Sequence, residues 1–196
     1  ISKSNGVIFS DFRHGIFNKS TIEFFKKNIK NKKKFLAADS QVASWWGNIL
    51  EFKNFDLITP NEKEARFALM DQISGIRSLA SRIYDKSKCK LLIMKLGKRG
   101  LLACINNKHH NSDSYFTLDS FATQVIDPVG AGDALLAYSS LALRASKSIL
   151  ISSILGSLAA SCECEKDGNI VIDPDEVNQK IKKLEESVNY SVTSKI

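Results

Sequence analysis

The chain reads Asp127-Pro128-Val129-Gly130-Ala131-Gly132-Asp133-Ala134 between a short apolar run, Thr123–Ile126, and a long segment of small and apolar residues. We expect a strand, a glycine-rich turn and the start of a helix, in that order. A turn of this kind exposes backbone N–H groups at the amino end of a helix, where the helix dipole also favours negative charge. The sequence therefore predicts an anion-binding site at Gly130, Ala131 and Gly132.

The carboxylate of Asp133 falls in the first turn of this expected helix, beside the predicted anion site. A carboxylate there can accept the proton of a hydroxyl nucleophile while the N–H groups hold the phosphoryl group in transfer. A purely structural alternative also fits, in which the glycines serve the geometry of the turn and Asp133 caps the helix.

Around this stretch, short apolar runs alternate with helical patterns along the whole chain. Runs such as Leu91–Met94 are apolar at every position, which suits a sheet that helices cover on both faces. The alternation predicts one α/β domain over residues 1–196, an αβα sandwich of three layers around a mostly parallel sheet. Three successive runs after residue 100 have no helix between them and predict an antiparallel edge. The expected strands are Val7–Ser10, Phe35–Ala38, Asp56–Thr59, Leu91–Lys95, Leu101–Ile105, Tyr115–Leu118, Thr123–Ile126 and Asn169–Ile172. The expected helices are Ser20–Lys30, Asn61–Met70, Gly75–Lys86, Gly132–Ser146, Ser148–Cys164 and Pro174–Tyr190.

Composition and charge suit a soluble globular protein, with 43% apolar and 25% charged residues. Part of the net charge of +7 comes from a lysine-rich run, residues 26–34, at the end of an expected helix. No aromatic residues interleave with this run to stack bases, so we interpret it as a solvated helix end and expect no nucleic-acid partner. The sequence shows no signal peptide and no apolar run of about 20 residues, so we expect a cytoplasmic protein without a membrane partner. The four cysteines lack the spacing of a zinc site, and we interpret them as free thiols.

The stretch 127–134 resembles the C-terminal signature of the ribokinase-like (PfkB) carbohydrate kinases, in which an aspartate, two small or hydroxyl residues and Gly-Ala-Gly-Asp follow one another. The resemblance implies a ribokinase-like fold, ATP as the phosphoryl donor, Asp133 as the catalytic base and the amides of Gly130–Gly132 as the anion hole. Pro128 and Val129 stand where the family often has threonine, which removes a hydroxyl contact to phosphate or to a monovalent cation. Asp127 can shape a loop for such a cation or serve only as a turn residue.

A second match lies at the end of another expected strand, where Thr59-Pro60 leads into a helical pattern that begins at Asn61. Asn61 and Glu64 match the Asn-x-x-Glu element of the family, whose glutamate helps organise Mg²⁺ through water and phosphate. The role suits the chemistry of the ion, since Mg²⁺ keeps several waters and needs few carboxylates beside the oxygens of the nucleotide. The structural alternative is a helix that Asn61 caps, with Glu64 as an acid of its first turn.

The third match is the turn Lys95-Leu96-Gly97-Lys98-Arg99-Gly100. It resembles the Thr-Leu-Gly-x-x-Gly turn that lies near the nucleotide phosphates in the family, with Gly97 and Gly100 in matching positions. Lys95 replaces the usual threonine and can pair with a phosphate or point into solvent. A hairpin turn between two strands is the structural alternative.

Two further strand ends are candidates for the acceptor side of the site. The segment Ser10-Asp11-Phe12-Arg13-His14-Gly15 resembles one in heptose-phosphate kinase-like members, and Ala38-Asp39-Ser40-Gln41 stands where such kinases often carry Asp-Pro-Lys. Ligands of open α/β sheets bind at the carboxyl ends of the strands. We therefore assign Asp11, Arg13 and Gln41 as candidate substrate residues.

Together these motifs favour the C-terminal part of an ATP-dependent kinase that phosphorylates a hydroxyl of a sugar or sugar phosphate. Because the sequence starts at Ile1 and opens on a strand, we expect an N-terminal part upstream, poor activity of this portion alone, and a full-length protein that can form a homodimer. Two alternatives stay open: a kinase of a vitamin or nucleoside alcohol, and a regulator that binds a nucleotide or sugar without turnover.

Overall fold

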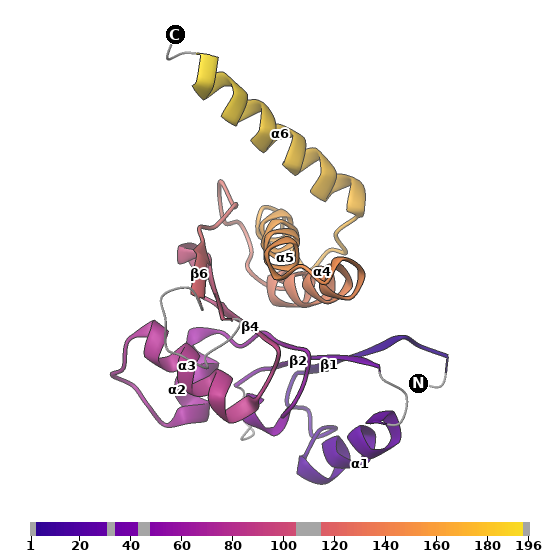
Figure 1. Cartoon of the computed structure of the whole chain (residues 1–196). Helices are drawn as coiled ribbons and strands as arrows, with labels where there is room; N and C mark the ends of the chain where they lie inside the picture. The colour runs from indigo at the N-terminus through magenta and orange to yellow at the C-terminus, as the bar shows by residue number, and fades with distance from the viewer. Residues whose placement is uncertain (1–2, 31–33, 43–47, 105–114, 194–196) are drawn as a thin grey trace.

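A single mostly parallel sheet runs through the described residues of the computed structural model, which are 3–30, 34–42, 48–104 and 115–193 (Figure 1). Its strands are β1 (Gly6–Asp11), β2 (Phe35–Ser40), β3 (Leu57–Ile58), β4 (Leu91–Lys95), β5 (Leu101–Cys104) and β6 (Tyr115–Leu118), and they lie side by side in that order. Strands β1 to β4 pair parallel, and β5 and β6 continue the sheet antiparallel. The predicted sheet and its antiparallel edge are confirmed.

Helices cover both faces of this sheet. They are α1 (Lys19–Lys30), η1 (Ile49–Glu51), α2 (Glu62–Leu69), α3 (Ile76–Ser87), η2 (Gly97–Arg99), α4 (Ala131–Ser146), α5 (Ile149–Cys164) and α6 (Pro174–Thr193). Figure 1 shows α1, α2 and α3 beneath the sheet, α4 and α5 above it, and α6 extending away beyond α5. This is the predicted sandwich of three layers. None of the helices in the described part combines the length and the apolarity that a bilayer span needs.

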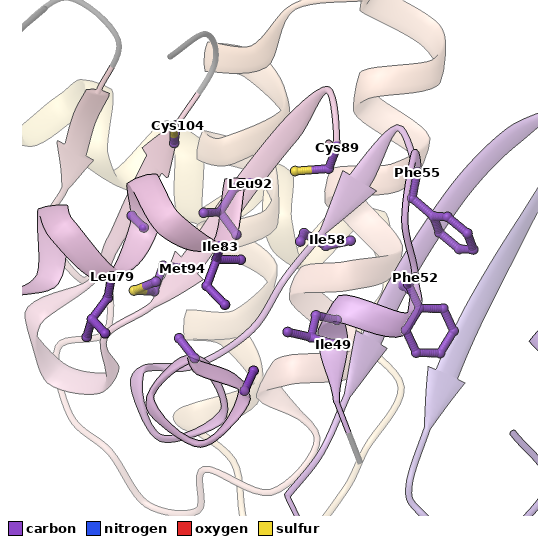
Figure 2. Packing of buried hydrophobic residues seen from close by; sticks show 14 of the residues in the cluster. Ile49, Phe52, Phe55, Ile58, Leu79, Ile83, Cys89, Leu92, Met94 and Cys104 are labelled. Carbon is purple, nitrogen blue, oxygen red and sulfur yellow. The ribbon is translucent and has the colours of Figure 1, made fainter. Parts of the chain in front are cut away.

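The central strand β4 buries side chains on both faces, as its apolar run Leu91–Met94 predicts. In β4, Leu92 and Met94 belong to the core beneath the sheet, whereas Leu91 and Ile93 belong to the core beneath α4 and α5. All four side chains are at most 1% exposed, since successive residues of a strand point to opposite faces. Figure 2 shows the lower core, where Phe52 and other large side chains fill the space between the sheet and the helices.

Helices α4 and α5 approach each other closely through small residues. A Cβ on Gly156 of α5 would lie 1.9 Å from Oγ of Ser139, so only glycine fits there. Two hydroxyls also cross-link the helices: Oγ of Ser139 donates to the carbonyl of Ser152 at 3.0 Å, and Oγ of Ser152 donates to the carbonyl of Ser139 at 2.8 Å. This packing fixes α4, whose amino end carries the glycine-rich turn.

Two predicted strands, Thr123–Ile126 and Asn169–Ile172, are wrong, because both segments are irregular. The N–H of Ile126 donates to the carbonyl of Cys164 at the end of α5, at 2.7 Å, and the N–H of Ile170 donates to a carboxylate oxygen of Glu163 at 3.0 Å. Both segments therefore run as loops tied to the carboxyl end of α5, and neither joins the sheet. Ile105 of the predicted fifth strand and residues 31–33 of the lysine-rich run lie outside the described residues.

Candidate active site

A cleft of about 870 Å³ opens at the carboxyl ends of the parallel strands, against the amino end of α4. Most of the residues that the sequence singled out line it. They are Gln41, Asn61, Glu64, Lys95, Gly97, Gly100, Gly130, Ala131, Gly132 and Asp133. Asp11, Arg13 and Asp127 are absent from its lining among the described residues.

The glycine-rich turn has a backbone that only glycine accommodates easily. Gly130 is the N-cap of α4 and has a φ of 89°, in the left-handed region. A Cβ at this position would lie 2.4 Å from side-chain oxygens of both Asn169 and Glu163. The N–H groups of Gly132 and Asp133 follow in the first turn, where a helix offers no acceptor of its own. The N–H of Ala131 donates to the carbonyl of Pro128 at 3.3 Å, so Gly132 and Asp133 supply the better-placed amides. The anion site itself stays a prediction.

Asp127 shapes the entry to this turn. One oxygen of its carboxylate accepts the N–H of Val129 at 2.9 Å, as in an Asx turn. This contact is the turn role, one of the two roles that the sequence left open. A monovalent cation near the same loop stays a prediction.

The side chain of Asp133 forms a hydrogen bond with the sheet and does not cap its own helix. Within the described residues, no side-chain hydrogen bond caps the amino end of α4. Instead, Oδ1 of Asp133 accepts the hydroxyl of Ser10 at 2.9 Å, from the carboxyl end of β1, 123 positions earlier in the chain. The side chain is half-buried and lines the cleft. This arrangement favours a functional carboxylate over the capping alternative.

Lys95 points into the cleft and pairs with Asp39. Its Nζ lies 2.5 Å from Oδ2 of Asp39, and 3.3 Å from the position that a Cβ on Gly132 would take. Burial by itself would lower the pKa of Lys95. The carboxylates of Asp39, Glu64 and Asp133 outweigh burial and raise that pKa above its ordinary value. A charged ammonium therefore lies next to the predicted anion site.

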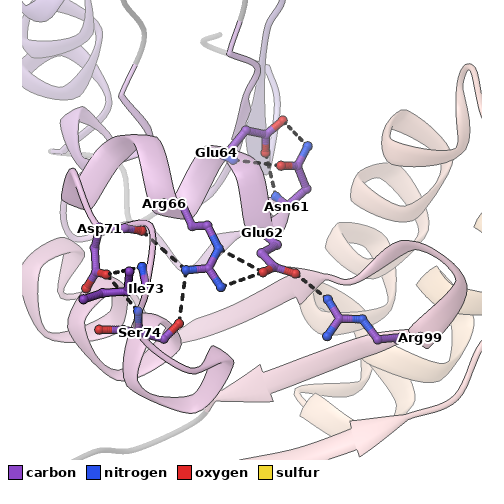
Figure 3. Close-up of polar contacts among 8 residues, drawn as sticks. All are labelled: Asn61, Glu62, Glu64, Arg66, Asp71, Ile73, Ser74 and Arg99. Atoms are coloured by element: carbon purple, nitrogen blue, oxygen red, sulfur yellow. Dashed lines mark hydrogen bonds and ion pairs between the residues drawn. The ribbon is translucent and has the colours of Figure 1, made fainter.

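Glu64 takes part in a complete capping box at the start of α2. Its two carboxylate oxygens accept the N–H and the side-chain amide of Asn61, both at 2.6 Å, and its own N–H donates to Oδ1 of Asn61 at 2.8 Å (Figure 3). The structural alternative for this motif is therefore realised. The same carboxylate is 5% exposed, lines the cleft, and has a pKa that burial raises to about 7.

The charges around Glu64 fit a divalent cation that a nucleotide brings with it. The carboxylates of Asp39, Glu64 and Asp133 act together on the ammonium of Lys95, and they would also stabilise a cation that arrives with phosphate. Lys63 and Lys98 line the same cleft and add positive charge for the phosphate itself. Among the described residues, no three acidic, histidine or cysteine side chains gather as a metal site. An ion held here would therefore draw most ligands from water and phosphate, as Mg²⁺ does.

The turn after β4 is a hairpin turn and also a wall of the cleft. Gly97 and Gly100 have φ values of 61° and 79°, and a Cβ on Gly100 would lie 1.9 Å from the carbonyl oxygen of Leu118. Arg99 of this turn pairs with Glu62 of α2, which also pairs with Arg66 (Figure 3). The turn is thus held between the sheet and α2.

The acceptor candidates from β1 are used within the protein. Nη1 of Arg13 lies 2.6 Å from Oδ2 of Asp11, which also accepts the hydroxyl of Ser40 at 3.0 Å, and both charged side chains are buried. Between them, Phe12 is 41% exposed and lines the cleft, as does the exposed Gln41 of the next strand end. The assignment of Asp11, Arg13 and Gln41 to the substrate stays a prediction.

Sequence reasoning missed Ser10 and Asp39 as site residues. The two stand opposite each other in the parallel register of β1 and β2, one residue before each strand ends. A signal was present, since carboxyl ends of neighbouring parallel strands meet at one edge of a sheet. What the sequence alone lacks is the partner of each, Asp133 and Lys95.

Solved structures show the same fold. The crystal structure of phosphofructokinase-2 from Escherichia coli in complex with substrates and products matches with a TM-score of 0.74 and 18% identity, over 94% of this chain and 59% of that one. The structure of Arabidopsis thaliana ribokinase complexed with ribose and ATP matches with a TM-score of 0.74 and 22% identity, over 91% of this chain and 56% of that one. The fold is ribokinase-like.

Two curated relatives, each named bifunctional protein HldE, match most of the chain. The one from Desulfatibacillum aliphaticivorans is 28% identical over 180 residues, which cover 90% of this chain and 35% of the relative. The one from Helicobacter hepaticus is 28% identical over 193 residues, which cover 97% of this chain and 38% of the relative. The chain thus spans little more than a third of these relatives. The profile of the pfkB family carbohydrate kinases matches residues 17–176. The chain therefore belongs to the pfkB family of carbohydrate kinases.

Proposed function

We propose that this chain forms the phosphate-transfer part of an ATP-dependent kinase that phosphorylates a hydroxyl of a sugar or sugar phosphate. One observation carries the proposal. The carboxylate of Asp133, fixed on one oxygen by Ser10, shares a cleft with the glycine-rich amino end of α4 and the ammonium of Lys95. A base, an anion hole and a cation for the phosphoryl group are the parts that such a reaction needs.

In the proposed reaction, the oxygen of the acceptor hydroxyl forms a bond to the γ-phosphorus of ATP, and Asp133 accepts the proton of that hydroxyl. The bond from that phosphorus to the β,γ-bridging oxygen breaks, and ADP leaves. The amides of Gly130, Ala131 and Gly132 and the ammonium of Lys95 stabilise negative charge on the transferring group. Lys95 and Gly132 line the cleft and support this role, whereas the N–H of Ala131 would have to exchange its bond to the carbonyl of Pro128 for one to the phosphoryl group.

The nucleotide is proposed to lie between the turn of Gly97 and Gly100 and the turn of Gly130–Gly132, which face the same cleft. Glu64, with Asn61 holding its orientation, would bind Mg²⁺ through water, and the ion would neutralise the phosphates. A monovalent cation near Asp127 belongs to the same proposal. The acceptor would approach from the side of Phe12 and Gln41, near Asp11 and Arg13. We place this enzyme in the cytoplasm and assign residues 1–196 to a single domain of it.

A regulator that binds without turnover is the competing function from another class. Such a protein needs no base. The carboxylate of Asp133, however, lines the cleft and accepts the hydroxyl of Ser10, and it does not cap its own helix. This contact supports the kinase.

The experiment is a transfer assay with the full-length protein that carries this chain, [γ-³²P]ATP, Mg²⁺ and a panel of ribose, fructose 6-phosphate, a heptose phosphate, adenosine and pyridoxal. Label should move to a sugar or sugar phosphate. Transfer only to adenosine or pyridoxal would favour a nucleoside or vitamin kinase, and binding of ATP with no transfer would favour the regulator.

A further inference from the structure

We propose that Ser10 is the positioning residue of the catalytic base, and that its hydroxyl holds one oxygen of Asp133 so that the other faces the acceptor. The inference rests on the proposed function, because it assigns a task to the contact of the proposed base. Ser10 belongs to none of the motifs that identify the nucleotide site, and it comes from the opposite end of the chain.

The contact is directional. The hydroxyl of Ser10 donates to Oδ1 of Asp133 at 2.9 Å. Among the described residues, no protein donor to Oδ2 of Asp133 is found, although Lys95 acts on the carboxylate through its charge. A carboxylate can rotate about its last side-chain bond, and a donor fixed on one oxygen removes that freedom. Oδ2 is left to accept the proton.

Ser10 is itself held rigidly. It lies within β1 between two buried residues, Phe9 and Asp11, each 3% exposed. Phe9 packs its ring among those of Phe17, Phe25, Phe52 and Phe55 in the lower core. The carboxylate of Asp11 accepts the N–H of Arg13 at 2.9 Å, the guanidinium of Arg13 at 2.6 Å and the hydroxyl of Ser40 at 3.0 Å.

This rigidity gives the contact a function beyond cross-linking β1 to α4. A base that must lie within hydrogen-bond distance of a hydroxyl gains rate from orientation, and a loss of orientation slows chemistry without weakening the binding of the nucleotide. The groups proposed to hold phosphates are Lys95 and the backbone of the glycine-rich turn. Within the described part of the chain, the side chain of Lys95 pairs with Asp39 and the hydroxyl of Ser10 with Asp133, so the two contacts are separate.

The test compares Ser10→Ala, Ser10→Thr, Asp133→Asn and a control, Ser139→Ala, in the full-length protein that carries this chain. The probe is transfer from [γ-³²P]ATP to whichever of ribose, fructose 6-phosphate or a heptose phosphate the parent protein phosphorylates fastest. Ser139→Ala is the matched control, because it removes a serine hydroxyl bond of 3.0 Å from the same helix α4 without touching Asp133.

We expect Ser10→Ala to lower kcat about 10-fold to 100-fold, the effect of losing a hydrogen bond to a charged group. KM for MgATP should stay within about twofold of the parent, because the phosphate contacts remain. Ser10→Thr keeps the hydroxyl and should recover most of the rate. Ser139→Ala should lower the melting temperature at least as much as Ser10→Ala but leave kcat unchanged.

Two results overturn the inference while leaving the proposed function standing. One is a kcat of Ser10→Ala within about twofold of the parent when Asp133→Asn is inactive, since a lost hydrogen bond to a charged group should cost more. The other is a fall in kcat that is as large in Ser139→Ala as in Ser10→Ala. An active Asp133→Asn, or a parent protein that phosphorylates none of the sugars, contradicts the proposed function and the inference with it.

Discussion

Nζ of Lys95 lies 2.5 Å from Oδ2 of Asp39, which ties the end of β4 to the end of β2 inside the cleft. Both charges are largely removed from water, with side-chain exposures of 17% and 8%. A buried pair of this kind is costly to break, because the charge left behind has no partner. The pair therefore has a structural effect and a proposed functional one, and substitutions can separate them.

The first prediction concerns Lys95→Met, which keeps the apolar stem and removes the charge. The carboxylate of Asp39 would then be buried without a partner, and we expect the free energy of unfolding to fall by about 3 kcal/mol in urea titrations. Adding Asp39→Asn should recover most of the stability, because no buried charge remains. The double variant should still bind MgATP more weakly than the parent protein. Parent-like MgATP affinity in the double variant would exclude Lys95 as a phosphate contact.

The second prediction concerns the pH dependence of stability. Burial raises the pKa of Glu64 from 4.5 to about 7 in the folded chain. The folded state thus binds a proton that the unfolded state has already lost, so the contribution of Glu64 is full below pH 4.5 and is lost as the pH rises through about 7. In Mg²⁺-free buffer, Glu64→Gln should flatten the fall in stability over this range. An unchanged slope would contradict the assigned direction.

The third prediction concerns Gly130→Ala. This substitution has two costs. It puts a non-glycine residue at a φ in the left-handed region, and it places a Cβ 2.4 Å from side-chain oxygens of Asn169 and Glu163. Gly168→Ala is the matched control, since Gly168 has a φ of 80° and a Cβ added there would meet no atom within 4 Å. We expect a loss of about 1 kcal/mol in the control and a larger loss, with weaker MgATP binding, in Gly130→Ala. If thermal and urea unfolding gave the same loss of stability for Gly130→Ala and Gly168→Ala, the close approach to Asn169 and Glu163 would have no effect.

The fourth prediction concerns the 196-residue chain by itself. All the groups proposed to hold the nucleotide line one cleft within it, so we expect MgATP binding in calorimetry. Turnover should be poor, because the orientation of the acceptor contributes several orders of magnitude in rate, and this chain covers only 59% and 56% of the two solved structures that share its fold. A folded chain that gives no heat at millimolar nucleotide would contradict the proposed nucleotide site, and robust sugar-dependent turnover would contradict the second expectation.

Local features of the site could be predicted from the sequence. The glycine-rich turn, the start of α4 and the pairing of Asn61 with Glu64 depend on residues within a few positions of one another, where turn and capping rules act. The same dependence on local sequence explains why the strand predicted at Thr123–Ile126 is wrong. Its composition suits a strand, but the N–H of Ile126 finds an acceptor in Cys164, about forty positions away.

The long-range contacts could not be predicted. Ser10 meets Asp133 only because β1 ends beside the amino end of α4, and Lys95 meets Asp39 only because β2 and β4 lie on either side of β3. The sequence likewise indicated Asp11 and Arg13 as available side chains, whereas the fold pairs them with each other. Which charges remain open to a ligand is decided by tertiary packing.

The central claim is that Asp133 is the general base, and Asp133→Asn in the full-length protein tests it most directly. The substitution keeps the shape of the side chain and removes its charge and basicity. We predict that turnover falls by about 10²- to 10⁴-fold while the affinity for MgATP and the melting temperature change little. A variant that keeps more than about half of the parent turnover would contradict the account, since a base contributes at least 10²-fold.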